Sequence, residues 1–280
     1  MAGEKVWFVT GCSKGLGKAL VEELLKQGYS VAGTSRDKKN LERIFGAESE
    51  KFLPLSMNIR DEARVKEAIR LATEKFGRID VAVNNAGFTH LATVEEMSDS
   101  DVREEFDINV FGMLSVIRNI LPQMRMQGHG HIFNVSSLGA YNVGPLSGIY
   151  CATKHAVKAI SETLAQEVRQ FGIHVTDVKP GFMRTEFFGS SYKTTAPEDS
   201  PYKSLYDENM KFYMGQDGNQ PGDPRKAARL YIKVAEMDQP YESLPMGTDS
   251  CDGIRNICEN TAKLMNDMRS IAETTNYSAN

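Results

Sequence analysis

The chain has 280 residues, of which 41% are hydrophobic and 25% are charged, a composition that indicates a globular protein and excludes a disordered or fibrous one. A formal net charge of −4 leaves no excess of basic surface, which argues against nucleic acid as a partner, and no apolar run is long enough for membrane insertion. Four scattered cysteines and five histidines form neither a disulfide framework nor a metal-binding pattern, so we expect a cytoplasmic protein without a metal.

Short apolar runs alternate with segments of helical periodicity along the chain. Strands are predicted at 5–10, 29–34, 52–57, 80–83, 131–135, 173–178 and 243–248. Helices are predicted after the first strand through Leu25, then at 37–44, 61–76, 99–126, 150–171, 223–237 and 251–271. This alternation predicts an α/β fold, in which a single doubly wound parallel sheet of about seven strands carries helices on both faces.

The segment 181–222 interrupts this alternation, and we predict no strand within it. It is rich in aromatic residues: Phe182, Phe187, Phe188, Tyr192, Tyr202, Tyr206, Phe212 and Tyr213. We interpret residues 182–222 as a lid over an apolar substrate pocket, inside a single domain that spans residues 1–280. The aromatic side chains could equally contact a substrate or pack against one another.

A glycine-rich loop from Gly11 to Gly17 joins the first predicted strand to a helix. Glycines allow backbone N–H groups to approach a pyrophosphate closely, and the positive end of the helix dipole favours its negative charge. The loop therefore predicts a dinucleotide site. A strand-to-helix turn with a purely structural role is the alternative for this segment taken alone.

Tyr150 and Lys154 lie one helical turn apart on one predicted helix, separated by roughly 6 Å along its axis. An ammonium about 4 Å from a phenol contributes roughly 4 kcal/mol at an effective dielectric of about 20, or about three pKa units. Lys154 is therefore expected to lower the pKa of Tyr150 until it exchanges a proton near pH 7. Ser137 ends a strand at the edge where ligands bind parallel sheets, and its hydroxyl could hydrogen-bond a substrate oxygen.

Several motifs follow one another in a fixed order. They are Gly11-x-x-x-Gly15-x-Gly17, Asn84-Asn85-Ala86-Gly87, Asn109, Asn134-Val135-Ser136-Ser137, Tyr150-x-x-x-Lys154 and Pro180-Gly181. Over about residues 5–185 the chain resembles the short-chain dehydrogenase/reductase family, in its single-domain branch. The later run Leu244–Asp249 is similar to the last strand of members that act on retinoid- or steroid-like molecules.

This resemblance implies a Rossmann-type fold and a catalytic set of Ser137, Tyr150, Lys154 and Asn109. Tyr150 is the acid/base and Ser137 orients the substrate oxygen. Lys154 also binds the nicotinamide ribose, while Asn109 shapes its helix and holds a water that links Lys154 to solvent. For Asn109 the alternative is a hydrogen bond to a local helix carbonyl. The resemblance also implies a homodimer or homotetramer, formed through the helices near Asn109 and Tyr150.

Coenzyme preference depends on the residues after the second predicted strand. Ser35 stands where an NAD-preferring member would have a carboxylate, whereas Arg36 and Lys14 supply positive charge suited to a 2′-phosphate. We therefore expect NADP(H) to be favoured over NAD(H). Asp37 either caps the next helix or is the ribose-binding acid, and we favour the cap. Asn58 replaces an acid that is common in the family and can still hydrogen-bond the adenine.

The predicted cofactor contacts lie in the loops that follow the strands: Gly11, Ser13, Lys14, Gly15, Leu16, Gly17, Ser35, Arg36, Asn58, Ile59, Asn85, Ala86, Gly87, Tyr150, Lys154, Pro180, Gly181, Met183 and Thr185. The predicted substrate contacts are Ser137, Tyr141, Val143 and Tyr150. Together these residues predict an NADP(H)-dependent oxidoreductase that interconverts a carbonyl and a secondary alcohol, with a hydrophobic ketone or alcohol as its substrate. The alternatives are a noncatalytic dinucleotide-binding sensor, and an isomerase or dehydratase on the same fold.

Overall fold

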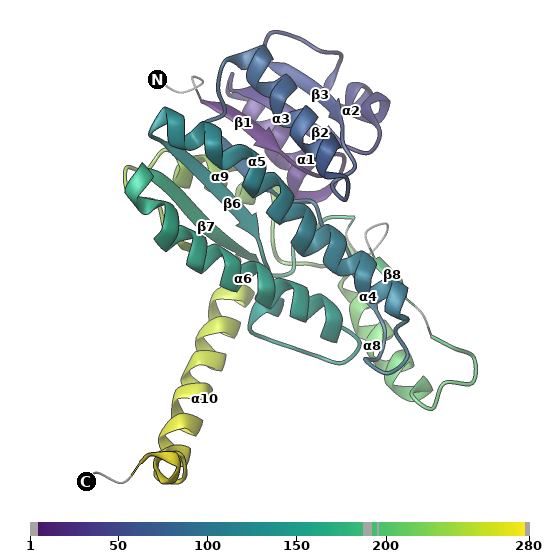
Figure 1. Ribbon diagram of the computed structural model, residues 1–280. Coiled ribbons are helices and arrows are strands. Elements are labelled where there is room, and N and C mark those ends of the chain that lie inside the picture. Colours follow the sequence, from purple (N-terminus) through teal and green to yellow (C-terminus); the bar gives the residue numbers. More distant parts are fainter. Residues whose placement is uncertain (1–4, 187–191, 195, 278–280) are drawn as a thin grey trace.

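A seven-stranded parallel sheet forms the centre of the protein, with its strands in the order β3-β2-β1-β4-β6-β7-β9 (Figure 1). The computed structural model describes residues 5–186, 192–194 and 196–277. The strands of this sheet are β1 (Val6–Val9), β2 (Ser30–Ser35), β3 (Phe52–Ser56), β4 (Val81–Asn84), β6 (Gly130–Val135), β7 (Ile173–Pro180) and β9 (Ser243–Met246). All seven predicted strands and the doubly wound α/β arrangement are confirmed.

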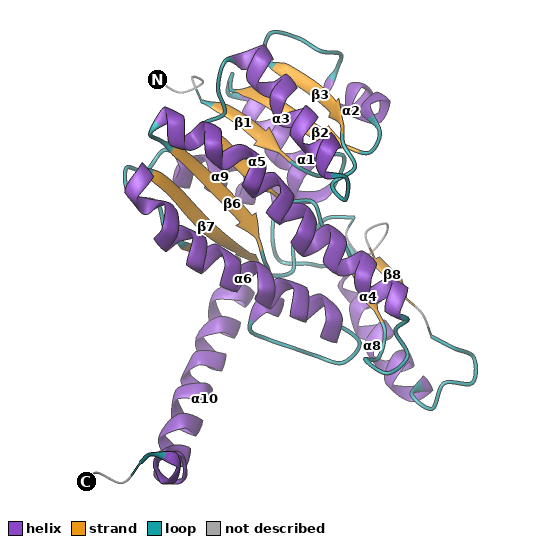
Figure 2. Cartoon of the chain, viewed as in Figure 1, coloured by secondary structure: helices purple, strands orange, loops and turns teal. Residues whose placement is uncertain are grey.

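Helices pack on both faces of the sheet (Figure 2). The helices are α1 (Gly15–Lys26), α2 (Lys38–Phe45), α3 (Glu62–Phe76), α4 (Asp99–Phe106), α5 (Gly112–Gln127), α6 (Gly148–Val168), α8 (Lys203–Gln216), α9 (Pro224–Ala235) and α10 (Thr248–Ala272). A five-residue π-helix, Asp107–Phe111, joins α4 to α5. Short 3₁₀ turns follow at Leu138–Ala140, Arg169–Phe171 and Glu273–Thr275.

The two faces of the sheet bury two separate hydrophobic cores. Successive side chains of a strand point to opposite faces, and in β1 Phe8 joins the core with α3, α5 and α6, whereas Trp7 and Val9 join the core with α1 and α9. Strands buried on both faces are expected to be continuously apolar. This explains why the β1 run, VWFV, shows no alternation.

One prediction about the lid was wrong, because 181–222 does contain a strand. Strand β8 (Tyr192–Thr194) pairs in parallel with β5 (Thr89–Leu91) in a separate two-stranded sheet. Strands of three residues are too short to show a period, and the pairing joins segments about a hundred residues apart. Phe187 and Phe188, counted among the lid aromatics, lie outside the described residues.

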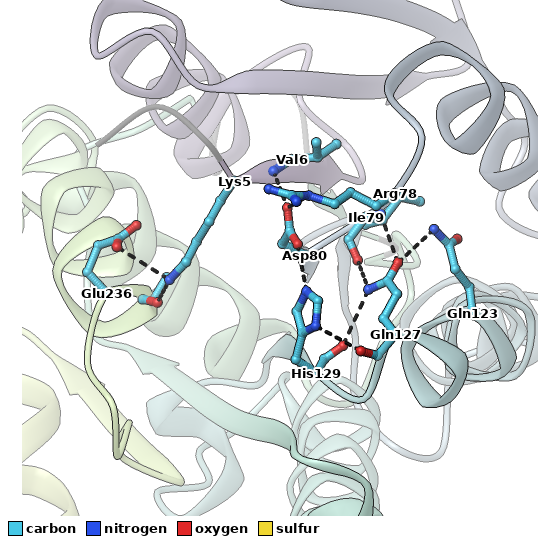
Figure 3. A network of polar contacts seen from close by, with 10 residues as sticks. Lys5, Val6, Arg78, Ile79, Asp80, Gln123, Gln127, His129 and Glu236 are labelled. Atoms are coloured by element: carbon cyan, nitrogen blue, oxygen red, sulfur yellow. Dashed lines mark hydrogen bonds and ion pairs between the residues drawn. The ribbon is translucent and has the colours of Figure 1, made fainter. Parts of the chain in front are cut away.

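A polar network ties together the amino-terminal edge of the sheet (Figure 3). The Asp80 carboxylate accepts hydrogen bonds from the Val6 N–H at 2.7 Å and from Arg78 Nε at 3.0 Å, and it lies 3.0 Å from His129 Nε2. Gln127 Nε2 donates to the Ile79 carbonyl at 3.1 Å. A cavity of about 390 Å³ opens at this edge, at the opposite end of the strands from the motif-bearing loops.

Helix α10 leaves the body of the molecule and ends far from it, near the C-terminus (Figure 1). Its first turns contact the body of the molecule, where Gly253 lies beside Leu138. No helix among the described residues combines the length and the apolar character needed to span a membrane.

Candidate active site

Two loops at the carboxyl edge of the sheet are held together by Thr10 and Asn85. The Thr10 hydroxyl accepts hydrogen bonds from the backbone N–H groups of Asn85 and Ala86, each at 3.0 Å. In return, Asn85 Nδ2 donates to the carbonyls of Thr10 and Gly11, also at 3.0 Å. The loop after β4 therefore supports the glycine-rich loop after β1.

The glycines of the first loop are required by this close approach. A Cβ on Gly11 would lie 2.7 Å from Ala86 Cα, and a Cβ on Gly17 would lie 2.5 Å from Asn85 Nδ2. Gly11 and Gly15 also have positive φ angles of 66° and 60°, which glycine adopts without strain. A bare backbone turn that leads into the N-terminus of α1 is a good cradle for a pyrophosphate, so these residues fit a dinucleotide, and Ser13 and Leu16 belong to the same turn.

The loop after β7 adjoins this cradle. Thr185 lies 3.8 Å from the position of a Cβ on Gly15, and Met183 pairs with Gly222 across the base of the lid. After Pro180, Gly181 packs against the Asp249 carboxylate, which also accepts a hydrogen bond from the Phe182 N–H at 2.6 Å. The structure thus brings the predicted cofactor residues of β7 next to those of β1.

At the end of β2, Asp37 is confirmed as a helix cap. Its carboxylate accepts hydrogen bonds from the backbone N–H groups of Lys39 and Asn40, which begin α2. The Ser35 hydroxyl donates to the Asp37 carbonyl at 2.7 Å. The end of β2 and the glycine-rich loop also supply two cations.

Those cations are Lys14 and Arg36. Burial lowers the pKa of Lys14, and repulsion from Arg36 lowers it further, while Glu186 raises it. Two like charges within reach of each other favour an anion placed between them. Asn58 lies at the adjacent end of β3, where its Oδ1 accepts from the Arg60 N–H at 3.2 Å, and Ile59 packs under the site against Gly112.

The catalytic candidates come together where β6 ends and α6 begins. Ser137 Oγ accepts a hydrogen bond from the Gly139 N–H at 2.9 Å, and it is also hydrogen-bonded to the Tyr150 hydroxyl. Lys154 is 6% exposed. Its Nζ donates to the Val135 carbonyl at 2.9 Å and lies 5.6 Å from the centroid of the Tyr150 ring.

The expected lowering of the Tyr150 pKa by Lys154 is not what the structure gives. Tyr150 is partly exposed, yet burial among protein atoms raises the pKa of its hydroxyl, and the hydrogen bond with Ser137 opposes this rise only in part. Lys154 lies over the face of the ring, and burial lowers its own pKa to about 8. Tyr150 is therefore held as a neutral phenol, which suits a proton donor.

Asn109 lies in the π-helix, and its hydrogen bonds are not local. Its Nδ2 donates to the Phe88 carbonyl at 2.9 Å and to Thr153 Oγ1 at 3.1 Å, and its Oδ1 accepts from the Phe88 N–H at 3.1 Å. The alternative of a local helix carbonyl is wrong. Asn109 instead joins the Asn84–Gly87 loop to the residue preceding Lys154, and Gly87 packs against both Asn109 and Lys154.

Sequence reasoning missed Glu105, at the end of α4. This carboxyl group is 0% exposed, and burial raises its pKa to about 8. Its Oε1 accepts from the His90 N–H at 3.3 Å, and its Oε2 has no hydrogen-bond partner among the described residues. Attraction to Lys154 lowers the pKa of Glu105 and raises that of Lys154. The signal in the sequence was an acid on the buried side of a helix, four residues before Asn109.

The predicted substrate residues lie on the loop between β6 and α6. The Tyr141 ring has Lys158 Nζ and Lys179 Nζ each 5.1 Å from its centroid, and Val143 is 63% exposed. From the lid, Tyr206 packs against Leu91 and Leu146 and is 2% exposed.

The hydroxyl of Tyr213, also in the lid, hydrogen-bonds with Pro145 and Ser147, just before α6. Because Tyr206 is buried against Leu91 and Leu146, packing is the role that the structure shows for it. In the part of the chain that the structure describes, no group of three or more His, Cys, Asp or Glu side chains could hold a metal ion.

Comparisons with known proteins agree with this geometry. The family described as short chain dehydrogenase matches residues 5–196. Oxidoreductase BOA17 of Botryotinia fuckeliana is 36% identical over 251 residues, which are 89% of this chain and 90% of that protein. The crystal structure of a short-chain dehydrogenase from Streptomyces avermitilis superposes with a TM-score of 0.88 at 31% identity, covering 97% of this chain and 100% of that one.

A solved structure of ElxO with NADP bound superposes with a TM-score of 0.73 at 27% identity, covering 90% of this chain and 100% of that one.

Proposed function

Because the chain belongs to the short-chain dehydrogenase/reductase family and is an oxidoreductase acting on CH–OH groups, we propose that it is a carbonyl reductase that uses NADPH to reduce hydrophobic ketones to secondary alcohols. The observation that carries the proposal is the cluster of Ser137, Tyr150 and Lys154 beside the glycine-rich loop. These groups supply a proton and a hydrogen bond at one place, which is what reduction of a carbonyl oxygen requires.

The residues divide the chemistry as follows. When bound, a nicotinamide coenzyme supplies the hydride that reaches the carbonyl carbon. Tyr150 donates its phenolic proton to the carbonyl oxygen, and the Ser137 hydroxyl stabilises the negative charge that develops there. Because burial raises the pKa of Tyr150, the phenol keeps its proton until the oxygen becomes strongly basic. A neutral phenol supplies the proton that reduction of a ketone requires.

Lys154 and Asn109 support Tyr150. The Lys154 ammonium stabilises the phenolate that forms when Tyr150 gives up its proton, since it lies 5.6 Å from the ring centroid. Asn109 fixes the loop beside Lys154 through its two hydrogen bonds to Phe88. We assign to Asn109 the water that passes a proton from solvent to Lys154 and so restores Tyr150.

The coenzyme we propose is NADP(H). The turn from Gly11 to Gly17 would hold the pyrophosphate, and Lys14 and Arg36 would bind the 2′-phosphate. Charge is the argument for this preference, since the only acid at the end of β2, Asp37, is engaged as a helix cap. The solved ElxO structure with NADP bound shows that a chain of this fold accepts that coenzyme.

The substrate class follows from the lid. We propose that residues 182–222 close over the ketone within a single domain, 1–280, and that Tyr141 and Val143 line the entrance. Exposed Phe212 and Met214 on α8, at 52% and 39%, give the lid the apolar surface that a bulky hydrophobic ketone would cover. A cytoplasmic location and association of copies through α5 and α6 complete the proposal.

The test is Tyr150→Phe, which keeps the packing of the ring and removes only the proton carrier. Turnover of a ketone with NADPH is expected to fall by at least about 100-fold, the contribution typical of a positioned acid. NADPH binding, followed by nicotinamide fluorescence, should change less than about threefold. Tyr241→Phe, which removes a hydroxyl from an exposed side chain just before β9, is the control. Undiminished turnover of Tyr150→Phe would refute the mechanism.

A further inference from the structure

Two charged side chains of β7 are buried behind the candidate active site, and the proposed chemistry does not use them. Asp177 is 0% exposed and Lys179 is 1% exposed. Lys179 Nζ lies 3.2 Å from Asp177 Oδ2, and it donates a hydrogen bond to Ser243 Oγ at 2.6 Å. Burial of two charges is costly unless their contacts are well placed. The remaining contact of the Lys179 ammonium indicates what the pair does.

That contact is the aromatic ring of Tyr141. Lys179 Nζ lies 5.1 Å from the ring centroid, and Lys158 Nζ, from α6, lies at the same distance. An ammonium group is attracted to the face of an aromatic ring, most strongly where water is excluded. Lys158 is oriented in turn by Glu162, whose Oε2 accepts a hydrogen bond at 2.9 Å. The Tyr141 ring is therefore attached to the sheet through Lys179 and to α6 through Lys158.

Tyr141 directly follows the 3₁₀ turn that begins after Ser137. The Tyr141 N–H donates to the Leu138 carbonyl at 3.0 Å, and the Gly139 N–H donates to Ser137 Oγ at 2.9 Å. The turn also packs against the catalytic phenol, because a Cβ on Gly139 would lie 3.3 Å from Tyr150 Cε1. The direction of the Ser137 hydroxyl thus depends on a turn whose far end is held by the Tyr141 ring.

We propose that the three charged residues Asp177, Lys179 and Lys158 are positioning residues for the reaction. They hold the Tyr141 ring in place, and the ring fixes the turn that directs the Ser137 hydroxyl toward the substrate oxygen. Asp177 supplies the countercharge that keeps the buried Lys179 an ammonium. The effect on rate rests on the proposed function, whereas the order of the turn can be measured without any turnover.

The test uses variants that remove each ammonium from the ring. Lys179→Met with Asp177→Asn replaces the buried pair by uncharged side chains of similar length, which leaves no buried charge without its partner. Lys158→Gln removes the second ammonium, and Lys158→Arg, which keeps a cation at the ring, is its matched control. All turnover is measured at about pH 6, because Asp177 also attracts Lys154, whose pKa is about 8.

Ketone turnover is expected to fall about tenfold in the pair variant and about threefold in Lys158→Gln, since the cation–π attraction is weaker at the more exposed site. Lys158→Arg should keep the wild-type rate, and NADPH binding should change less than about twofold in every variant. In a Ser137→Ala background the same changes should have no further effect, because the group that they position is then missing. A general structural defect would lower turnover in both backgrounds.

Hydrogen exchange measures the turn itself. The backbone amides of residues 139–142 should exchange at least about fivefold faster in the pair variant than in the wild-type protein, with no change in residues 15–26 of α1. Unchanged exchange of residues 139–142 would overturn the proposal, as would an equal loss of turnover in the Ser137→Ala background. If the pair variant does not fold, the comparison of Lys158→Gln with Lys158→Arg decides. A wild-type protein that reduces no ketone would contradict the proposed function, and exchange alone would then decide whether the ring holds the turn.

Discussion

At the end of β2, two cations and an acid that caps α2 determine whether the site favours a ribose with a 2′-phosphate or one with a 2′-hydroxyl. Lys14 and Arg36 are close enough for Arg36 to lower the pKa of Lys14. The Asp37 carboxylate caps the N-terminus of α2. The sequence left two interpretations of Asp37 open, because an acid about twenty residues beyond the glycines fits either role. Only the positions of the Lys39 and Asn40 N–H groups separate them.

Arg36→Ala should therefore change coenzyme preference. Loss of one charge-assisted contact of about 1.5–3 kcal/mol is expected to weaken NADPH binding about 10- to 100-fold, with less than about a threefold effect on NADH. Fluorescence titration with both coenzymes measures this difference. Arg43→Ala, which removes the same group from the far end of α2, should alter neither affinity. Equal losses for NADPH and NADH in Arg36→Ala would show that Arg36 does not read the 2′-phosphate.

Glu105 shows what residue-level reasoning from sequence leaves out. The motif residues were found because their spacing is fixed by backbone geometry, but in the run DVREEF only the position four residues before Asn109 separates the buried Glu105 from the half-buried Glu104. The net direction of the pKa shift of Tyr150 was also predicted wrongly, since a helical spacing gives the separation along the axis and not the burial of the phenol.

Glu105→Gln should move the alkaline limit of ketone reduction to lower pH. Lys154 has a pKa lowered to about 8 by burial, which Glu105 and Asp177 oppose. Reduction needs the ammonium form, so the rate is full below this pKa and falls as pH rises through it. Loss of the Glu105 charge lowers the pKa of Lys154 further, so the rate is expected to fall at lower pH.

The pH dependence of the ketone reduction rate measures this shift, with Glu104→Gln as the neighbouring control. A profile of Glu105→Gln that coincides with that of the wild-type protein would remove Glu105 from the electrostatics of Lys154.

At the scale of elements, Asp80 joins three segments at the amino edge of the sheet: the start of β1, the residue before β4 and the turn before β6 (Figure 3). The carboxylate is 6% exposed. Asp80→Ala would leave the Val6 N–H, Arg78 and His129 without the carboxylate that they share. We expect a loss of about 2 kcal/mol in the free energy of unfolding, measured by urea denaturation.

Turnover by the folded fraction of Asp80→Ala should be unchanged, because the network lies at the opposite end of the strands from Tyr150. Asp238→Ala, at an exposed position, should change stability by less than about 0.5 kcal/mol. A stability of Asp80→Ala equal to that of Asp238→Ala would mean that the network does not hold the three segments together.

The long elements were predictable and the short ones were not. Seven strands followed from apolar runs bounded by turn residues, whereas β5 and β8 have three residues each and form only by pairing with each other. The predicted helix 99–126 is present, but the π-helix at its centre, which presents Asn109, leaves no mark on a 3.6-residue period. The last predicted helix, 251–271, is present as part of α10, but its projection from the body was not predicted, because it depends on where the last strand ends.

For the whole molecule, the doubly wound arrangement explains why motifs far apart in sequence share one site. The carboxyl ends of β1, β4, β6 and β7 lie side by side, so the loops that follow them converge at one edge, while the amino edge carries the Asp80 network. The order of strands and their loops could be predicted from alternation. The way the lid packs could not, because its contacts join Tyr206 to Leu91 and Leu146 across long stretches of chain.

The most direct measurement of the central claim is nicotinamide absorbance during incubation of the purified protein with NADPH or NADH and ketones of increasing apolar size. We predict that NADPH is consumed in step with secondary alcohol, faster than NADH and fastest with bulky apolar ketones. Product formed with no net change in absorbance would indicate an isomerase or dehydratase. Coenzyme binding without turnover of any ketone would contradict the account in favour of a sensor, and failure to bind either coenzyme would contradict it entirely.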